Sequence, residues 1–119
     1  MTYTIDQGDA GKPDLETVSK EMLVIFKDSL GADWVKIRPD MEKQVMEVRA
    51  SIDYINELQI AGELTEESAR ELIEFQQLNI KMLMIEFGGM KDIAIETAIN
   101  AAFKKVREAV NRLVNFELL

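Results

Sequence analysis

The side chains with the greatest capacity for chemistry are the acidic residues of one short segment. Five glutamates fall between positions 63 and 74: Glu63, Glu66, Glu67, Glu71 and Glu74. Carboxylates can bind a hard cation or exchange protons with a substrate, which makes a dense group of them a candidate site. They also suit the first turns of a helix, where negative charge interacts favourably with the helix dipole. The second interpretation is the stronger one, so we predict no metal site and no catalytic residue here.

Two residue types that carry much of enzyme chemistry are absent from the chain. The sequence contains no histidine and no cysteine. This excludes disulfides, thiolate zinc sites, iron–sulfur clusters, the serine triad and the Glu-x-x-His motif of di-iron four-helix proteins. We therefore predict that the protein needs no cofactor and is not an enzyme. An enzyme with a carboxylate-bound metal is kept as the third hypothesis.

The adjacent Gly88 and Gly89 could form either a phosphate-binding loop or a turn. A phosphate loop follows a strand and ends in lysine followed by serine or threonine. Here the preceding segment is helical in pattern, and Glu86 and Asp92 flank the glycines. We predict a turn between two helices. The alternative is a kink within one long helix, although two interior glycines would destabilise such a helix by about 2 kcal/mol.

Three amide side chains interrupt an apolar segment: Gln76, Gln77 and Asn79. They could face solvent, or a buried amide among them could fix the register of packed helices or contact a ligand. The solvent-facing strip is the preferred interpretation.

Length and composition indicate one helix-rich domain. The chain has 119 residues, of which 47% are hydrophobic and 30% are charged, with only two prolines. We predict a flexible N-terminal tail over residues 1–13 and a single domain over 14–119. The net charge of −8 argues against nucleic acid as a partner. Charged residues break the most apolar region, so we predict no membrane span and, with no signal peptide recognised, a cytoplasmic location by default.

Hydrophobic spacing predicts four helices. The first follows a capping Asp14 and ends at Gly31, and the second begins at Pro39 and carries Met41, Val45, Val48, Ile52 and Ile55 at steps of 3 and 4. The segment between them lacks helical periodicity, and Pro39 favours an extended Arg38, so a linker is expected there. Thr65 caps a third helix over about 66–87, and a fourth spans about 92–115. The predicted fold is an all-α antiparallel bundle of about four helices with a long C-terminal helical hairpin.

Charge patterning predicts the register of that hairpin. Residues 62–89 carry a net charge of −4, whereas residues 90–119 carry +1. A chain that reverses at the glycines places four pairs of opposite charge across the hairpin. The pairs are Glu67 with Arg112, Arg70 with Glu108, Glu71 with Arg107, and Glu74 with Lys104.

Apolar residues exceed what four helices of this length can bury. The third helix becomes apolar nearly all round toward its end, and the sequence finishes with more apolar residues. We predict a contact surface that includes Ile80, Met84, Phe87, Phe116, Leu118 and Leu119. The leading hypothesis is a non-enzymatic interaction or assembly module, a homo-oligomer or a component of a larger complex. The alternative is a small acidic helical chaperone or regulator that binds an amphipathic helix of a partner protein.

Overall fold

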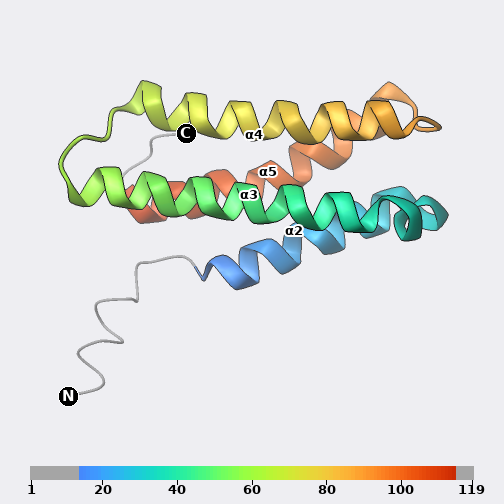
Figure 1. The fold of residues 1–119 in the computed structure, drawn as a ribbon, viewed down its shortest axis with the longest axis horizontal. Helices are drawn as coiled ribbons and strands as arrows, with labels where there is room; N and C mark the ends of the chain where they lie inside the picture. The colour runs from blue at the N-terminus through green and yellow to red at the C-terminus, as the bar shows by residue number, and fades with distance from the viewer. Residues whose placement is uncertain (1–13, 115–119) are drawn as a thin grey trace, which may run out of the picture.

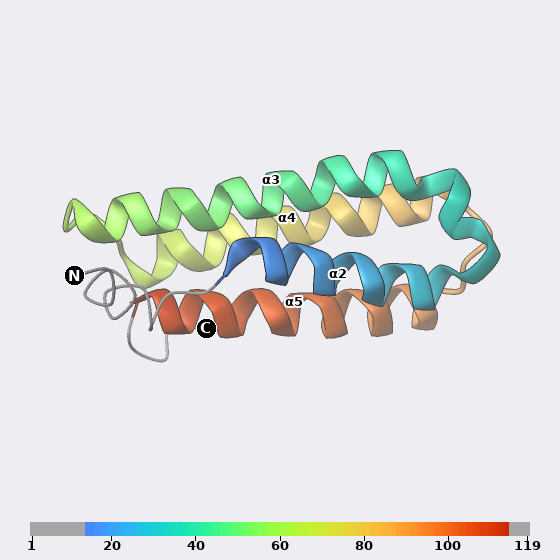
Figure 2. The same ribbon diagram turned by 90° about the horizontal axis from the view of Figure 1, so that it is seen from below.

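The structure, a computed structural model, describes residues 14–114. Successive helices run in opposite directions and lie side by side as a bundle (Figure 1, Figure 2). The predicted all-α antiparallel bundle of about four helices is confirmed. The predicted tail at 1–13 lies outside the described residues. The elements are α2 (Leu15–Leu30), the short 3₁₀ helix η1 (Gly31–Asp33), α3 (Trp34–Ile60), α4 (Glu66–Phe87) and α5 (Asp92–Val114).

Local capping chemistry sets the start of α2. The Asp14 carboxylate accepts hydrogen bonds from the backbone N–H groups of Glu16 and Thr17 and from the Thr17 hydroxyl. These bonds satisfy amides that have no partner within the helix. The Thr17 hydroxyl is the largest influence on Asp14, and together these bonds hold the pKa of its carboxyl below the ordinary value, because they favour the charged form. The prediction of Asp14 as a cap is confirmed.

The start of α3 differs from the prediction. The helix begins at Trp34, so the segment expected to be a linker is helical, and Pro39 lies inside the helix. Proline has no backbone N–H to donate and crowds the preceding turn, which makes this position unfavourable on local grounds. Trp34 and Ile37 are both buried. They extend the apolar seam of α3 by two turns, and this burial offsets the local cost of the proline.

The core collects one face of every helix. Around the bundle, α2 lies against α3 and α5, and α4 lies against the same two helices, while α3 and α5 also meet across the centre. The start of α2 and the end of α5 lie toward the same end of the bundle (Figure 2). Large, fully buried side chains from each of the four helices belong to one core cluster, among them Phe26, Met41, Ile80 and Phe103.

The connection between α4 and α5 is the predicted turn. Gly88 ends α4 with a φ of 78°, and Gly89 follows with a φ of 81°. The Gly88 N–H donates to the carbonyl of Ile85 over 3.1 Å. Side chains of L-residues rarely tolerate such φ angles, whereas glycine does so readily. The turn is confirmed, and the alternative of one long kinked helix is wrong.

Candidate functional site

The outward face of α4 carries large apolar side chains that are about half exposed. These side chains, at positions 75, 78, 82 and 85, follow one another at steps of 3, 4 and 3 residues, so they lie in one line along the helix. The opposite face of α4 lies in the core and holds Ala69, Ile73, Ile80 and Met84. The helix therefore has two apolar faces, of which the bundle covers only one. We call the outward line the α4 stripe: Phe75, Leu78, Met82 and Ile85, with exposed fractions of 59%, 51%, 49% and 52%.

The α4 stripe contains none of the residues that the sequence assigned to a contact surface. Ile80 and Met84 are fully buried, so the prediction that they lie on a contact surface is wrong. Phe87 is half-buried against the core. Phe116, Leu118 and Leu119 lie outside the described residues. The exposed line falls on the side of α4 opposite the buried residues, because α3 and α5 lie against that buried side.

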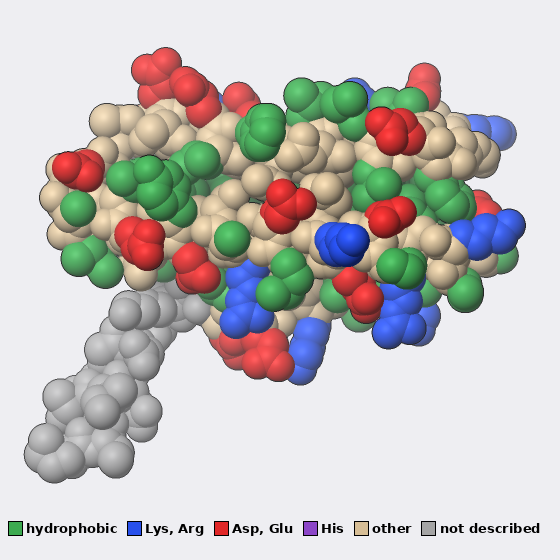
Figure 3. All heavy atoms as spheres, in the orientation of Figure 1, with side chains coloured by type: hydrophobic (Ala, Val, Ile, Leu, Met, Phe, Trp, Pro, Cys, Tyr) green, Lys and Arg blue, Asp and Glu red, His purple; other side chains and the backbone are tan. Residues whose placement is uncertain are grey.

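A hollow of about 590 Å³ lies between α3 and α4, next to the connection that joins them. We call it the α3/α4 hollow. Phe75 belongs both to this hollow and to the α4 stripe, so the two form one continuous surface. Hydrophobic side chains gather along the face that α3 and α4 present (Figure 3). The lining comprises Tyr54 and Leu58 from α3, Leu72 and Phe75 from α4, and the more polar Glu63, Thr65, Ser68 and Glu71.

The residues on the α3 side of this hollow were not predicted from the sequence. Tyr54 and Leu58 lie one turn apart on α3 and outside its buried seam, with Tyr54 50% exposed. Their spacing could have predicted this surface, because two apolar residues at i and i+4 outside the buried seam of a helix indicate a second apolar face.

The predicted hairpin charges lie on facing helices but are not joined. Among the residues that the structure describes, none of the four predicted pairs forms an ion pair, and Arg70 binds Glu66 on its own helix instead. Arg70, Glu74 and Arg107 do line one small hollow together. Glu67, Glu71, Lys104, Glu108 and Arg112 are exposed. Exposed long side chains gain little from any single partner, so a neighbour one turn away on the same helix competes well.

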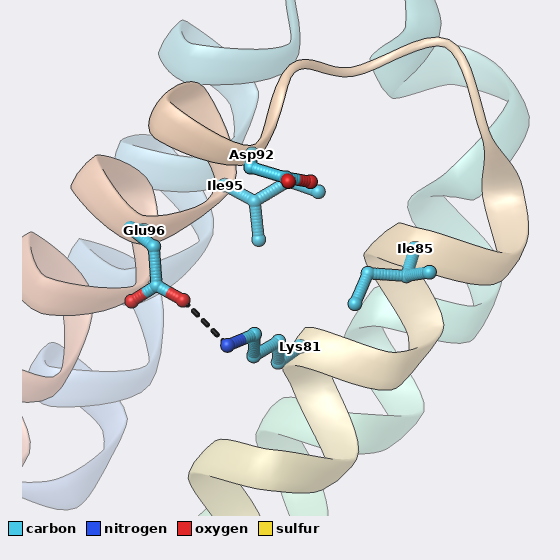
Figure 4. A pocket seen from close by; sticks show the side chains of 5 residues that line it. All are labelled: Lys81, Ile85, Asp92, Ile95 and Glu96. Carbon is cyan, nitrogen blue, oxygen red and sulfur yellow. Dashed lines mark ion pairs between the residues drawn. The ribbon is translucent and has the colours of Figure 1, made fainter.

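Lys81 and Glu96 join α4 to α5 near the predicted register. The Lys81 Nζ lies 2.6 Å from the Glu96 Oε1, with both side chains nearly half exposed. The hydrogen bond to Glu96 raises the pKa of Lys81, and the negative charges of Glu96 and Asp92 act in the same direction. Ile85 and Ile95 complete a hollow of about 340 Å³ around the pair (Figure 4). The pair connects α4 to α5 across the hairpin, and an ion pair with this exposure contributes little to stability.

The glutamates first considered for chemistry do not converge. Within residues 14–114 no three Asp or Glu side chains are grouped so as to hold a metal ion. Glu66 binds Arg70 near the start of α4, and Glu63, Glu67, Glu71 and Glu74 are exposed. Thr65 caps the same helix through a reciprocal pair of hydrogen bonds with Ser68. Glu66 and Glu67 lie in the first turn of α4, where the helix dipole favours negative charge.

Gln76 is buried, contrary to the preferred prediction that the amides form a solvent-facing strip. It is 7% exposed, and its Oε1 has no hydrogen-bond partner in the structure; the same holds for the Oε1 of Gln44 on α3. Gln77 and Asn79 are half-buried. A buried acceptor without a partner loses its hydration and gains nothing in return.

Gln76→Met is expected to raise the free energy of unfolding by about 1 kcal/mol or more, because it removes the unpaired acceptor and nearly preserves side-chain length. Urea denaturation followed by circular dichroism measures the change. The matched control is Gln77→Met at the half-buried neighbouring position, where we expect a change within about 0.5 kcal/mol. A loss of stability in Gln76→Met would instead mean that the amide makes favourable hydrogen bonds in the folded protein.

No helix in the described part of the chain is long and apolar enough to cross a membrane.

Comparisons with models of protein families, with curated proteins and with solved structures found no match to this chain.

Proposed function

We propose that the protein is a non-enzymatic interaction module whose contact surface is the α4 stripe. The observation that carries the proposal is the pattern of exposure on α4, where four large apolar side chains in one line remain about half exposed. Contiguous exposed apolar surface of this kind is typical of protein contact sites. The non-enzymatic part rests on a sequence without histidine or cysteine.

The spacing of the α4 stripe suits a helix as the contacting element. Steps of 3 and 4 residues form the seam along which two helices pack nearly parallel or antiparallel. A second copy is one candidate, because an antiparallel arrangement would set Phe75 opposite Ile85 and Leu78 opposite Met82. Self-association and association with a different protein therefore use the same surface, and the mass in solution separates them.

Leu78→Glu combined with Met82→Glu is expected to abolish association without unfolding the chain. Both side chains are about half exposed in the bundle, so the carboxylates stay hydrated in the free protein but would lose water at an interface. Light scattering over a concentration series and binding of a hydrophobic dye are measured together. We expect the parent either to self-associate or to bind dye as a monomer, and the double variant to do neither.

The matched control places the same two charges on other helices. Val24 on α2 and Ile93 on α5 are 54% and 77% exposed, so Val24→Glu with Ile93→Glu adds equal charge elsewhere. This control should behave as the parent does, and all proteins should keep their helical circular dichroism. A parent that is monomeric at high micromolar concentration and binds no dye would remove the main support for an interaction module.

A further inference from the structure

The α3/α4 hollow combines an apolar lining with negative charge. Four of its lining side chains are apolar or aromatic, and Tyr54 and Phe75 are both at least half exposed. Glu63 and Glu71 also line it, and none of the lining residues is lysine or arginine. An occupant must therefore offer apolar side chains to the lining and positive charge to its edge.

The chain around the hollow is acidic over a longer span. Residues 53–75 hold seven acidic side chains and a single basic one, Arg70. The Arg70 guanidinium binds Glu66 on its own helix, so its charge is already compensated. In an antiparallel contact that sets Phe75 opposite Ile85, the far end of the second α4, with Glu86, would lie opposite this hollow, and each copy carries a net charge of −8. Like charges at an interface oppose association, which disfavours a second copy as the occupant of the hollow.

We propose that the α3/α4 hollow and the α4 stripe together bind a cationic amphipathic helix of another protein. The inference rests on the proposed function and specifies its partner. The continuous surface runs along α4 from Leu72 to Ile85, a length of about 20 Å, which about 13 residues of a helix would span. Apolar side chains of the partner at i, i+3, i+4 and i+7 lie against the surface. Its lysine or arginine side chains flank that line and meet Glu63 and Glu71.

The test uses two synthetic helical peptides of about 18 residues that differ only in charge. One carries leucine at i, i+3, i+4 and i+7 with lysine at its polar positions, and the other replaces every lysine with glutamate. Each is labelled with a fluorophore and titrated with the full-length protein, and binding is followed by anisotropy. We expect the lysine peptide to bind and the glutamate peptide to bind at least about tenfold more weakly, with the lysine complex weakened by added salt.

Two charge-reversed proteins locate the binding site. Glu63→Lys with Glu71→Lys is expected to weaken binding of the lysine peptide by about tenfold or more, because both lining carboxylates become like charges. The control, Asp28→Lys with Glu108→Lys, changes the net charge equally at exposed positions on α2 and α5. It should bind within about threefold of the parent, since exposed charges on other faces are screened.

Three results would overturn the proposal: equal weakening in the control pair, equal affinity for the two peptides, or no binding of the lysine peptide. The first would mean that overall charge alone attracts the peptide, and the second that apolar contact alone does so. In either case the proposed function survives if the parent still binds dye or self-associates through the α4 stripe. Loss of dye binding, self-association and peptide binding together would remove both.

Discussion

Met84→Glu is expected to destabilise the protein by more than about 4 kcal/mol and to leave much of it unfolded. Met84 has no exposed surface and lies among the core residues of the bundle. A carboxylate there would lose its hydration without a cationic partner, and burial of an uncompensated charge is among the most destabilising single changes. The whole stability of a domain is only about 5–15 kcal/mol, so a loss of this size is severe. Urea denaturation followed by far-ultraviolet circular dichroism measures it.

The matched control lies two residues away on the same helix. Met82 is 49% exposed, so Met82→Glu should change the free energy of unfolding by about 0.5 kcal/mol or less. The comparison holds residue type, helix and introduced charge constant and varies only the side of α4. Similar losses in both variants would mean that α4 is rotated about its axis relative to the bundle described above.

The rotation of α4 is a feature that the sequence alone could not determine. Buried Ile80 and Met84 and exposed Leu78 and Met82 are all large, apolar and helically spaced. Periodicity identifies an apolar face, but it does not decide between two such faces on one helix. That choice depends on where α3 and α5 lie, which is a property of the whole bundle. The hypothesis of an exposed apolar surface on this helix was therefore reasonable, while the residues assigned to it were partly wrong.

Helix ends were predictable where their cause is local. Asp14, Thr65 and Gly88 act through the first or last turn of their own helices, by hydrogen bonding or by φ preference, and all three fall where the sequence indicated. The start of α3 was not predictable in this way. Pro39 is a local signal against helix, and the burial of Trp34 and Ile37 that outweighs it comes from other elements.

The charge pattern carried real information about orientation and little about individual contacts. It indicated an antiparallel pairing of a helix over about 66–87 with one over about 92–115, and the bundle contains this pairing between α4 and α5. The specific partners were decided by side-chain reach, as Arg70 shows by binding Glu66 one turn away. Lys81 and Glu96 make the contact across the hairpin because both are partly buried where the two helices meet. Weak exposed interactions of similar energy leave too little difference for a sequence pattern to select among them.

Gly88→Ala combined with Gly89→Ala is expected to lower the free energy of unfolding by about 2 kcal/mol or more. Both glycines have positive φ angles, and Gly88 combines φ 78° with ψ 172°, a region that L-residues other than glycine almost never occupy. Space is not the cause, since an added Cβ would meet no atom within 4 Å at either position. The cost is backbone strain, reduced in part because alanine also restricts the unfolded chain.

Gly62, another glycine with a positive φ angle, provides the reference for this result. Gly62 follows α3 with a φ of 75° and also has open space around its Cα, so Gly62→Ala measures the cost of one such position at an ordinary helix end. Thermal unfolding of Gly62→Ala, the Gly88 and Gly89 double variant and the parent should rank the double variant lowest. A melting temperature above that of the parent would mean that alanine lets α4 continue into α5 as one helix. In that case the bundle would not depend on a reversal of the chain at Gly88 and Gly89, and positive φ angles would not be required at these two positions.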